Sequence, residues 1–391
     1  MNGKPNMLTC KRNKFTLPPS LTYLNCAYMA PLLKSAEKAG IRGLRAKRNP
    51  SRINTEDFFS DSEALRKAFA QLINAPDPKR IVIIPSVSYG MANAAHNIRL
   101  QKGENIVVAD QQFPSNYYPW KRLCDEAGAE MKVISPPDTH TDRGKKWNER
   151  ILESITSATR VVAIAPVHWA DGTRFDLAAI RRRSHEVGAL LIVDGTQAVG
   201  AMPFDIGQIQ PDALVCAGYK WLLGPYSIGL AWYGPYFDNG TPIEENWINR
   251  LHSEDFTNLV NYQNEYQPGA LRYEVGEHSN FILVPMLLKA VQQLNNWKPE
   301  RIQAYCREIT SKPLGVLKEK GFWIEDEGWR GAHLFGIRLP AGTDLEKVKA
   351  HLLRHKIYVS YRGNAIRVSP NVYNTELDMN RLVRELVKAV R

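Results

Sequence analysis

The sequence lacks any apolar run of the roughly eighteen or more residues that a membrane-spanning helix needs. It also lacks a secretory signal, because residues 1–16 are polar and mildly basic, without an apolar core or a small-residue cleavage site. Hydrophobic residues make up 44% of the chain and charged residues 23%, which is typical of a globular protein. We therefore expect neither membrane insertion nor export.

Cysteine is scarce as well, with five residues spread over the chain and no pair in a Cys-x-x-Cys spacing. An odd number of scattered cysteines argues against a disulfide framework and against a zinc site. We therefore expect no metal site, and a reducing, cytoplasmic compartment.

A long basic tract is also missing, although the net charge is +11 at pH 7. The basic residues occur in short groups, such as residues 42–48 and 181–183, which solvated helix faces explain. We therefore expect no nucleic-acid partner. The positive field would instead favour a small anionic substrate and an anionic cofactor.

What the sequence does contain is a regular alternation of short β-rich runs and helical stretches. A chain of 391 residues exceeds the size of most single cores, so two domains are expected. The predicted strands cover residues 80–85, 105–110, 130–135, 160–166, 189–194, 213–217 and 229–233. Because helical stretches separate most of these runs, we predict the α/β class, with a mainly parallel seven-stranded sheet flanked by helices.

The pattern changes near residue 268. From there the sequence predicts helices over residues 280–297 and 300–320, three short strands, another helix before the last two of them, and a closing helix. Helices packed on a small antiparallel sheet form an α+β domain. The predicted parts are an N-terminal arm associated with the smaller domain (1–20), a large α/β domain (21–267) and a C-terminal α+β domain (268–391).

Two charged residues follow neighbouring predicted strands. Ligands of open α/β sheets bind at the carboxyl ends of the strands, where the sequence has Asp194 and then Lys220. Lys220 stands between Tyr219 and Trp221 in a stretch poor in charge, so partial burial would favour a neutral amine suited to carbonyl chemistry. Taken alone, Asp194 would be a helix cap or a surface residue.

Six short motifs follow one another along the chain in a specific order. They are Tyr23-Leu24-Asn25-Cys26-Ala27, Phe113-Pro114-Ser115-Asn116, Asp194-x-x-Gln197, Tyr219-Lys220, Arg272-Tyr273 and Arg367-Val368-Ser369-Pro370-x-x-Tyr373-Asn374. Their order and spacing resemble the class V aminotransferase branch of fold-type I pyridoxal-5′-phosphate (PLP) enzymes, which includes cysteine desulfurases, isopenicillin N epimerase-like proteins and kynureninases. The resemblance implies the PLP-dependent transferase fold, with PLP bound by the large domain.

The resemblance also implies roles for individual residues. Lys220 would hold PLP as a Schiff base and move the proton at the substrate α-carbon. Asp194 would pair with the pyridinium nitrogen, and Gln197 would reach the phenolic oxygen of the ring. Because Asp194, Gln197 and Lys220 act on the cofactor directly, we predict that these three are the catalytic residues.

Further cofactor contacts are predicted from the same resemblance. The backbone of Val87, the hydroxyl of Ser88 and the hydroxyl of Tyr219 would bind the phosphate, although Ser-x-Ser before a helix is also an ordinary N-cap. Phe113 would cover the ring, with core packing as the alternative. His168, which follows a strand, would orient the substrate or touch the phenolic oxygen, unless it is only a turn residue before Asp171-Gly172.

Substrate binding and assembly are the last implications of the resemblance. Arg367 would grip the substrate α-carboxylate, supported by Arg362, and Asn25 would also contact substrate. A surface arginine is the alternative for Arg367. Relatives form homodimers with the active site at the interface, and here Trp247 and Ser279 would reach the phosphate of the neighbouring subunit.

The resulting functional prediction is a PLP enzyme that acts at the α-carbon of an amino acid, as an aminotransferase or an epimerase. A kynureninase-like or cystine-type lyase is the alternative, favoured by Phe113-Pro114-Ser115-Asn116. Persulfide-forming desulfuration is disfavoured because residues 325–366 contain no cysteine. A catalytically inactive binding protein is a third hypothesis, against which the intact Asp194 and Lys220 count.

Overall fold

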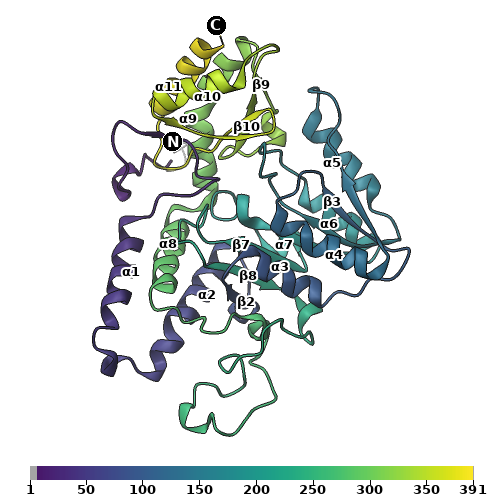
Figure 1. Ribbon diagram of the computed structural model, residues 1–391, viewed down its shortest axis with the longest axis vertical. Coiled ribbons are helices and arrows are strands. Elements are labelled where there is room, and N and C mark those ends of the chain that lie inside the picture. The colour runs from purple at the N-terminus through teal and green to yellow at the C-terminus, as the bar shows by residue number, and fades with distance from the viewer. Residues whose placement is uncertain (1–6, 391) are drawn as a thin grey trace, which may run out of the picture.

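The computed structural model describes residues 7–390 (Figure 1). In this part of the chain the strands form sheets of seven, four and two strands. The large sheet contains β2 (Ile81–Ile84), β3 (Asn105–Ala109), β4 (Glu130–Ile134), β5 (Thr159–Ile164), β6 (Leu190–Asp194), β7 (Ala213–Ala217) and β8 (Gly229–Tyr233). The α/β fold class with a mainly parallel seven-stranded sheet is therefore confirmed.

The order of strands across the large sheet is β2-β8-β7-β6-β5-β3-β4. Neighbours from β7 to β4 pair in parallel, whereas β8 is antiparallel to both β7 and β2. Because β5, β6 and β7 lie side by side and parallel, the loops that follow them meet at one edge of the sheet.

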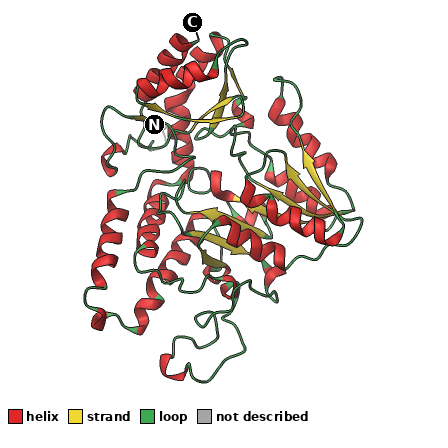
Figure 2. Cartoon of the chain, viewed as in Figure 1, coloured by secondary structure: helices red, strands yellow, loops and turns green. Residues whose placement is uncertain are grey.

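Both faces of the large sheet are buried. Along β2, Ile81 and Ile83 pack into one hydrophobic core, whereas Val82 and Ile84 pack into another on the opposite face. Helices cover these faces, as Figure 2 shows. They are α2 (Ser60–Leu72), α3 (Val87–His96), α4 (Tyr118–Ala127), α5 (Arg143–Ser154), α6 (Leu177–Glu186) and the short α7 (Ile206–Ile209). This explains why the strands read as continuous apolar runs and not as alternating ones.

The C-terminal part has a small antiparallel sheet of order β12-β13-β10-β9, covered by helices. Its elements are α9 (Pro299–Glu319), β9 (Trp323–Ile324), β10 (Phe335–Arg338), α10 (Leu345–Arg354), β11 (Ile357–Tyr358), β12 (Ser360–Arg362), β13 (Ala365–Val368) and α11 (Glu376–Ala389). The preceding α8 (Leu283–Trp297) packs against α1 (Lys34–Ala46) and α2. The smaller α+β C-terminal domain is confirmed.

The N-terminal segment lies against this smaller domain. Strand β1 (Thr22–Tyr23) pairs in parallel with β11, and the chain before it runs beside the C-terminal elements in Figure 1. Residues 1–6 of the predicted arm lie outside the described residues, and the boundaries at 20/21 and 267/268 stay predictions. No helix within residues 7–390 is long and apolar enough to span a bilayer.

Candidate active site

A buried cavity of about 280 Å³ opens at the carboxyl ends of the central strands. Its wall is built by the loops after five strands. It includes Ser86, Val87 and Ser88 after β2; Gln112, Phe113 and Ser115 after β3; Trp169 after β5; Asp194, Thr196 and Gln197 at and after β6; and Tyr219 and Lys220 after β7. Seven of the residues predicted from sequence therefore share one cavity.

Lys220 lies on this wall with only 5% of its surface exposed. Its Nζ lies 5.0 Å from the centroid of the Phe113 ring and 5.5 Å from that of Tyr219. Burial lowers the pKa of Lys220 to about 8, although the carboxylate of Asp194 opposes this shift. Because this lowered pKa leaves more neutral amine near neutral pH than an exposed lysine has, Lys220 is suited to attack carbonyl groups.

Asp194 is the last residue of β6 and is equally buried, at 5% exposure. Its Oδ1 accepts a hydrogen bond of 3.0 Å from the N–H of Thr196, so it does cap the turn that follows. Burial raises the pKa of Asp194, whereas Thr196 and Lys220 lower it. The capping role and a role in the cavity are therefore compatible, because one carboxylate oxygen is enough for the cap.

Gln197 is held on the wall by two hydrogen bonds. Its Nε2 donates to the carbonyl of Ala27 at 3.1 Å, and its Oε1 accepts from Nε1 of Trp221 at 2.8 Å. Because an amide nitrogen carries two hydrogens, one N–H of Gln197 remains for a group in the cavity. The side chain is thereby oriented before any ligand binds.

The first turn of α3 forms another part of the wall. Ser86 caps the helix by accepting from the N–H of Tyr89 at 3.2 Å, and its Oγ lies 2.9 Å from Oγ of Ser88. The N–H groups of Val87 and Ser88 stand in the first turn, where a helix supplies no acceptor of its own. The N-cap alternative thus applies to Ser86, while Val87 and Ser88 present donors suited to an anion.

Arg367 is almost fully buried on β13, at 1% exposure. Its Nη1 donates to the carbonyl of Trp169 at 2.8 Å, and its Nη2 donates to Oγ of Ser360 at 3.2 Å. The Ser360 hydroxyl in turn donates to Oδ1 of Asn25 at 2.7 Å. Arg367 is therefore not a surface arginine, and Asn25 is linked to it through one hydroxyl.

Arg362 and Arg367 flank the indole ring of Trp169, at 5.2 and 5.9 Å from its centroid. The Nε atoms of both arginines are buried without a hydrogen-bond partner among the described residues. Burial, together with repulsion from Arg362, lowers the pKa of Arg367 to about 9. Two adjacent guanidinium groups with unpaired donors would be stabilised by an anion.

The predicted substrate-binding residues Asn25, Arg362 and Arg367 lie outside the lining of the cavity, and so do three predicted cofactor-binding residues. Both ring nitrogens of His168 contact protein, with Nε2 3.1 Å from the carbonyl of Asp110 and Nδ1 3.3 Å from Oδ1 of Asp171. Trp247 packs in an aromatic cluster with Phe58 and Phe256. Ser279 is half-buried outside the lining residues. The structure brings none of these three beside Lys220 within one chain.

Sequence reasoning missed several residues of the wall, among them Trp169, Thr196 and Gln112. Trp169 lines the cavity, whereas the neighbouring His168, which was predicted to do so, does not. The Nε1 of Trp169 donates to the carbonyl of Gln111 at 2.6 Å. Thr196 lies inside the Asp194-x-x-Gln197 motif, which was a usable signal. Gln112 directly precedes Phe113, and its buried Nε2 has no partner among residues 7–390, which leaves a donor for an occupant.

These features match the functional groups of PLP. The phosphate needs hydrogen-bond donors, which the first turn of α3 supplies, and the aldehyde needs a nucleophilic amine, which Lys220 supplies. The ring nitrogen needs a carboxylate to stay protonated, and Asp194 lies on the same wall. The unpartnered Nε2 of Gln112 adds a donor that only an occupant can satisfy.

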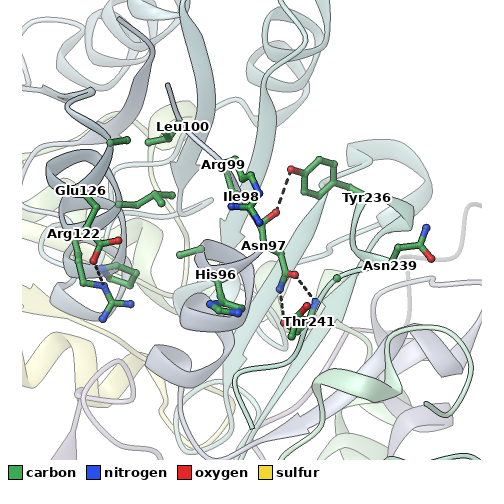
Figure 3. Close-up of a pocket in the computed structure, with 15 residues that line it drawn as sticks. His96, Asn97, Ile98, Arg99, Leu100, Arg122, Glu126, Tyr236, Asn239 and Thr241 are labelled. Carbon is green, nitrogen blue, oxygen red and sulfur yellow. Dashed lines mark hydrogen bonds and ion pairs between the residues drawn. The ribbon is translucent and has the colours of Figure 1, made fainter. Parts of the chain in front are cut away.

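A second cavity, of about 810 Å³, is larger but more open and lies between the ends of α3 and α4 and residues 236–241 (Figure 3). Some of its polar groups pair with one another: the side-chain amide of Asn97 bonds to the main chain of Thr241 at 2.7 and 2.9 Å, and Arg122 lies 3.8 Å from Glu126. Among the described residues that line it there is no lysine. The smaller cavity around Lys220 is therefore the candidate active site.

Comparison with known proteins identifies the family of the chain. Residues 52–384 match the family model of class-V aminotransferases. An uncharacterized aminotransferase, YcbU of Bacillus subtilis, is 26% identical over 85% of each chain, and a probable cysteine desulfurase of Streptomyces coelicolor is 32% identical over 68% of this chain and 63% of its own.

Among solved structures, the cystine C-S lyase C-DES in complex with cysteine persulfide has the same fold. Its TM-score is 0.83 at 17% identity, over 94% of this chain and 98% of the other. The family model covers most of the sequence, and the cavity wall fits the cofactor of that family. The chain therefore belongs to the class-V aminotransferase family and is a PLP-dependent enzyme.

Proposed function

We propose that this enzyme breaks a bond at the α-carbon of an amino acid, as an aminotransferase or an epimerase, with Lys220 as the residue that links PLP covalently. The observation that carries the proposal is the joint burial of Lys220 and Asp194 on one cavity wall. A buried amine of lowered pKa and a buried carboxylate are the two groups that PLP chemistry requires of its protein.

Bound PLP supplies an electron sink for the bond broken at the substrate. Asp194 keeps a proton on the ring nitrogen, and Gln197 donates its free N–H to the phenolic oxygen. Phe113 excludes water from one side of the ring. Val87, Ser88 and Tyr219 bind the phosphate; the first turn of α3 supports this assignment for the first two.

For the substrate, we assign the α-carboxylate to Arg367, whose unpaired Nε and neighbouring Arg362 favour an anion. Asn25 orients Arg367 through Ser360 and thereby contributes to substrate binding. Lys220, once released, removes or returns the proton at the α-carbon. His168 has an indirect role, since its hydrogen bonds to Asp110 and Asp171 fix the loop that carries Trp169.

We further propose a homodimer in which Trp247 and Ser279 of a second copy complete the phosphate site. In its support, Trp247 is 38% exposed, and neither residue is used by the cavity of its own chain. We also propose a cytoplasmic location. It is supported by the five cysteines, all of them free thiols and four of them buried.

A lyase that breaks a Cβ–S or Cβ–C bond is the second candidate. The aromatic pair of Phe113 and Trp169, with ring centroids 5.3 Å apart at the cavity, favours it because such a pair can hold an apolar or aromatic leaving group. Desulfuration through an enzyme persulfide is not proposed, because residues 325–366 provide no thiol.

Product analysis of the PLP-loaded enzyme separates these reactions. The twenty amino acids, kynurenine and cystine are each incubated in D₂O with and without a keto acid. A new keto acid indicates transamination, the opposite enantiomer indicates epimerisation, and alanine or pyruvate indicates a lyase. The proposal predicts deuterium at the α-carbon of at least one substrate with wild type and with Lys312→Ala, an exposed control, but not with Lys220→Ala. Failure of every amino acid to exchange would refute the proposal.

A further inference from the structure

A cluster of three potential metal ligands lies in the C-terminal domain, on elements that take no part in the cavity around Lys220. His351 is on α10, His355 directly follows this helix, and Glu385 is on the adjacent α11 (Figure 1). One ligand atom from each residue lies within 4.8 Å of the other two. The side chains thus converge from two packed helices.

The hydrogen bonding of His355 shows which of its ring nitrogens is available to bind a cation. Its Nδ1 lies 2.9 Å from the backbone carbonyl of His351, and a carbonyl oxygen can only accept, so Nδ1 carries the proton. A neutral ring then has a lone pair at Nε2, which lies 3.5 Å from Oε2 of Glu385. Two acceptors therefore face each other, and a cation between them would stabilise this arrangement: a second proton on the ring or a metal ion.

The separations agree with a metal ion. Nε2 of His351 lies 3.0 Å from the same Oε2 of Glu385. A tetrahedral zinc ion with ligands at about 2.0–2.1 Å places neighbouring ligand atoms ~3.3 Å apart, between the two observed values. The four-residue spacing of His351 and His355 places both imidazoles on one face of the helix.

The surroundings of Glu385 also orient it for this task. Its Oε1 accepts from Nε of Arg384 at 2.8 Å and from Nζ of Lys388 at 3.3 Å, which leaves Oε2 for the histidines. Outer hydrogen bonds of this kind fix the direction of metal ligands, and so does the bond from Nδ1 of His355 to the main chain. The carboxylate is buried, whereas the side chains of His351 and His355 are 24% and 36% exposed, so water can reach the fourth position.

We propose that His351, His355 and Glu385 bind one divalent zinc-like transition-metal ion, with water as fourth ligand, and that this ion fastens α10 to α11. The two imidazoles and one carboxylate suit zinc, cobalt or nickel better than magnesium or calcium, which prefer oxygen ligands. The lack of Cys-x-x-Cys pairs predicts no metal site, but the ligands proposed here are two histidines and a glutamate that lies far from them in the sequence. Arg384 and Lys388 weaken the attraction for a cation, so the binding is reversible.

The test uses the full-length, PLP-loaded protein, treated with a chelator and then dialysed against buffered zinc sulfate. Zinc is counted by mass spectrometry after gel filtration. We expect one equivalent more in wild type than in His351→Ala or His355→Ala, whose apparent Kd rises at least ~10-fold. The matched control is His252→Ala, because His252 is exposed and also lies near a glutamate, Glu254, at 3.8 Å; it should bind zinc like wild type.

Thermal unfolding gives a second measurement that does not depend on zinc bound elsewhere. Zinc should raise the Tm of wild type and of His252→Ala, and should leave the Tm of His351→Ala unchanged, because only a site formed in the folded state stabilises it. Cobalt should give the visible spectrum of a tetrahedral site in the same two proteins. Equal zinc binding and equal Tm shifts in all variants, or no zinc in wild type, would overturn the proposal.

Discussion

Asp194 and Lys220 reach the same buried cavity from neighbouring parallel strands. Asp194 pairs with Val215 in the ladder between β6 and β7, and Lys220 follows just beyond the end of β7. Both side chains are 5% exposed, so burial penalises both charges: it raises the pKa of Asp194 and lowers that of Lys220. A charged cofactor ring bound between the two side chains would offset this cost of burial.

The lowered pKa of Lys220 predicts how the apoprotein takes up PLP. Only the neutral amine attacks the aldehyde, so the rate of covalent uptake should rise with pH and level off above about 8, well below the ordinary lysine value of 10.5. Stopped-flow absorbance against pH measures this midpoint. A rate still rising steeply up to the ordinary value would contradict the burial of this amine.

The same shift has a consequence for the stability of the apoprotein. Between about 8 and 10.5 the unfolded chain binds a proton at Lys220 that the folded chain does not. The contribution of this residue to the free energy of unfolding therefore increases as pH rises through this window, and below it the buried charge lowers stability. Lys220→Met should remove this increase, which urea unfolding at several pH values would detect; an unchanged pH dependence would speak against the assignment.

Asp194→Asn tests the electron-sink role with little change in shape. The amide oxygen can still accept from Thr196, but the ring nitrogen loses its anionic partner, so turnover should fall at least ~10²-fold while the protein remains folded. Asp205→Asn is the matched control, because Asp205 also caps a helix by accepting from a main-chain N–H, that of Gln208, and does not line the cavity. Near-normal kcat in Asp194→Asn would refute this role.

Arg367→Lys tests whether Arg367 binds the substrate α-carboxylate. A single ammonium cannot match the forked guanidinium, so KM for amino acids should rise ~10–100-fold, with a smaller change in kcat. Arg354→Lys, on the exposed side of α10, should leave both constants unchanged. Because Arg367 also bonds to Trp169 and Ser360, the Tm of each variant has to be compared. An unaltered KM in folded Arg367→Lys would move the carboxylate site elsewhere.

A buried ion pair next to β2 makes a prediction about stability. Glu274 accepts from the N–H of Ile83 at 2.9 Å and pairs with the buried Arg66, while His278 lies 3.4 Å away. Glu274→Gln removes the buried partner of Arg66 and leaves it only the half-exposed Glu63, 2.8 Å away, which should lower the free energy of unfolding by about 3 kcal/mol. Glu308→Gln, on the exposed face of α9, should cost under about 0.5 kcal/mol in the same denaturant titration. Equal stability of the two variants would contradict the account.

The large sheet could be predicted because its strands are buried on both faces. Residues 213–217 and 229–233, for example, are continuous apolar runs, and β7 and β8 have these same bounds. The strand order was not predictable in the same way. The antiparallel insertion of β8 between β7 and β2 depends on contacts between distant segments, which local periodicity does not report.

The cavity was partly predictable for a related reason. Asp194 and Lys220 follow strands that lie side by side, so their position at strand ends carried the information. His168 and Trp169 are neighbours in the same loop, and which one faces the cavity depends on the hydrogen bonds of His168 to Asp110 and Asp171. The contact of His168 with Asp110, which lies 58 residues earlier, leaves no signal in a single sequence.

The most direct test of the central claim is to map the covalent link between protein and cofactor. The PLP-loaded enzyme is reduced with borohydride and digested, and the peptides are analysed by mass spectrometry. The account predicts one pyridoxyl-phosphate adduct, on Lys220, and its loss in Lys220→Ala. An adduct on another lysine, or none in protein that binds PLP, would contradict it.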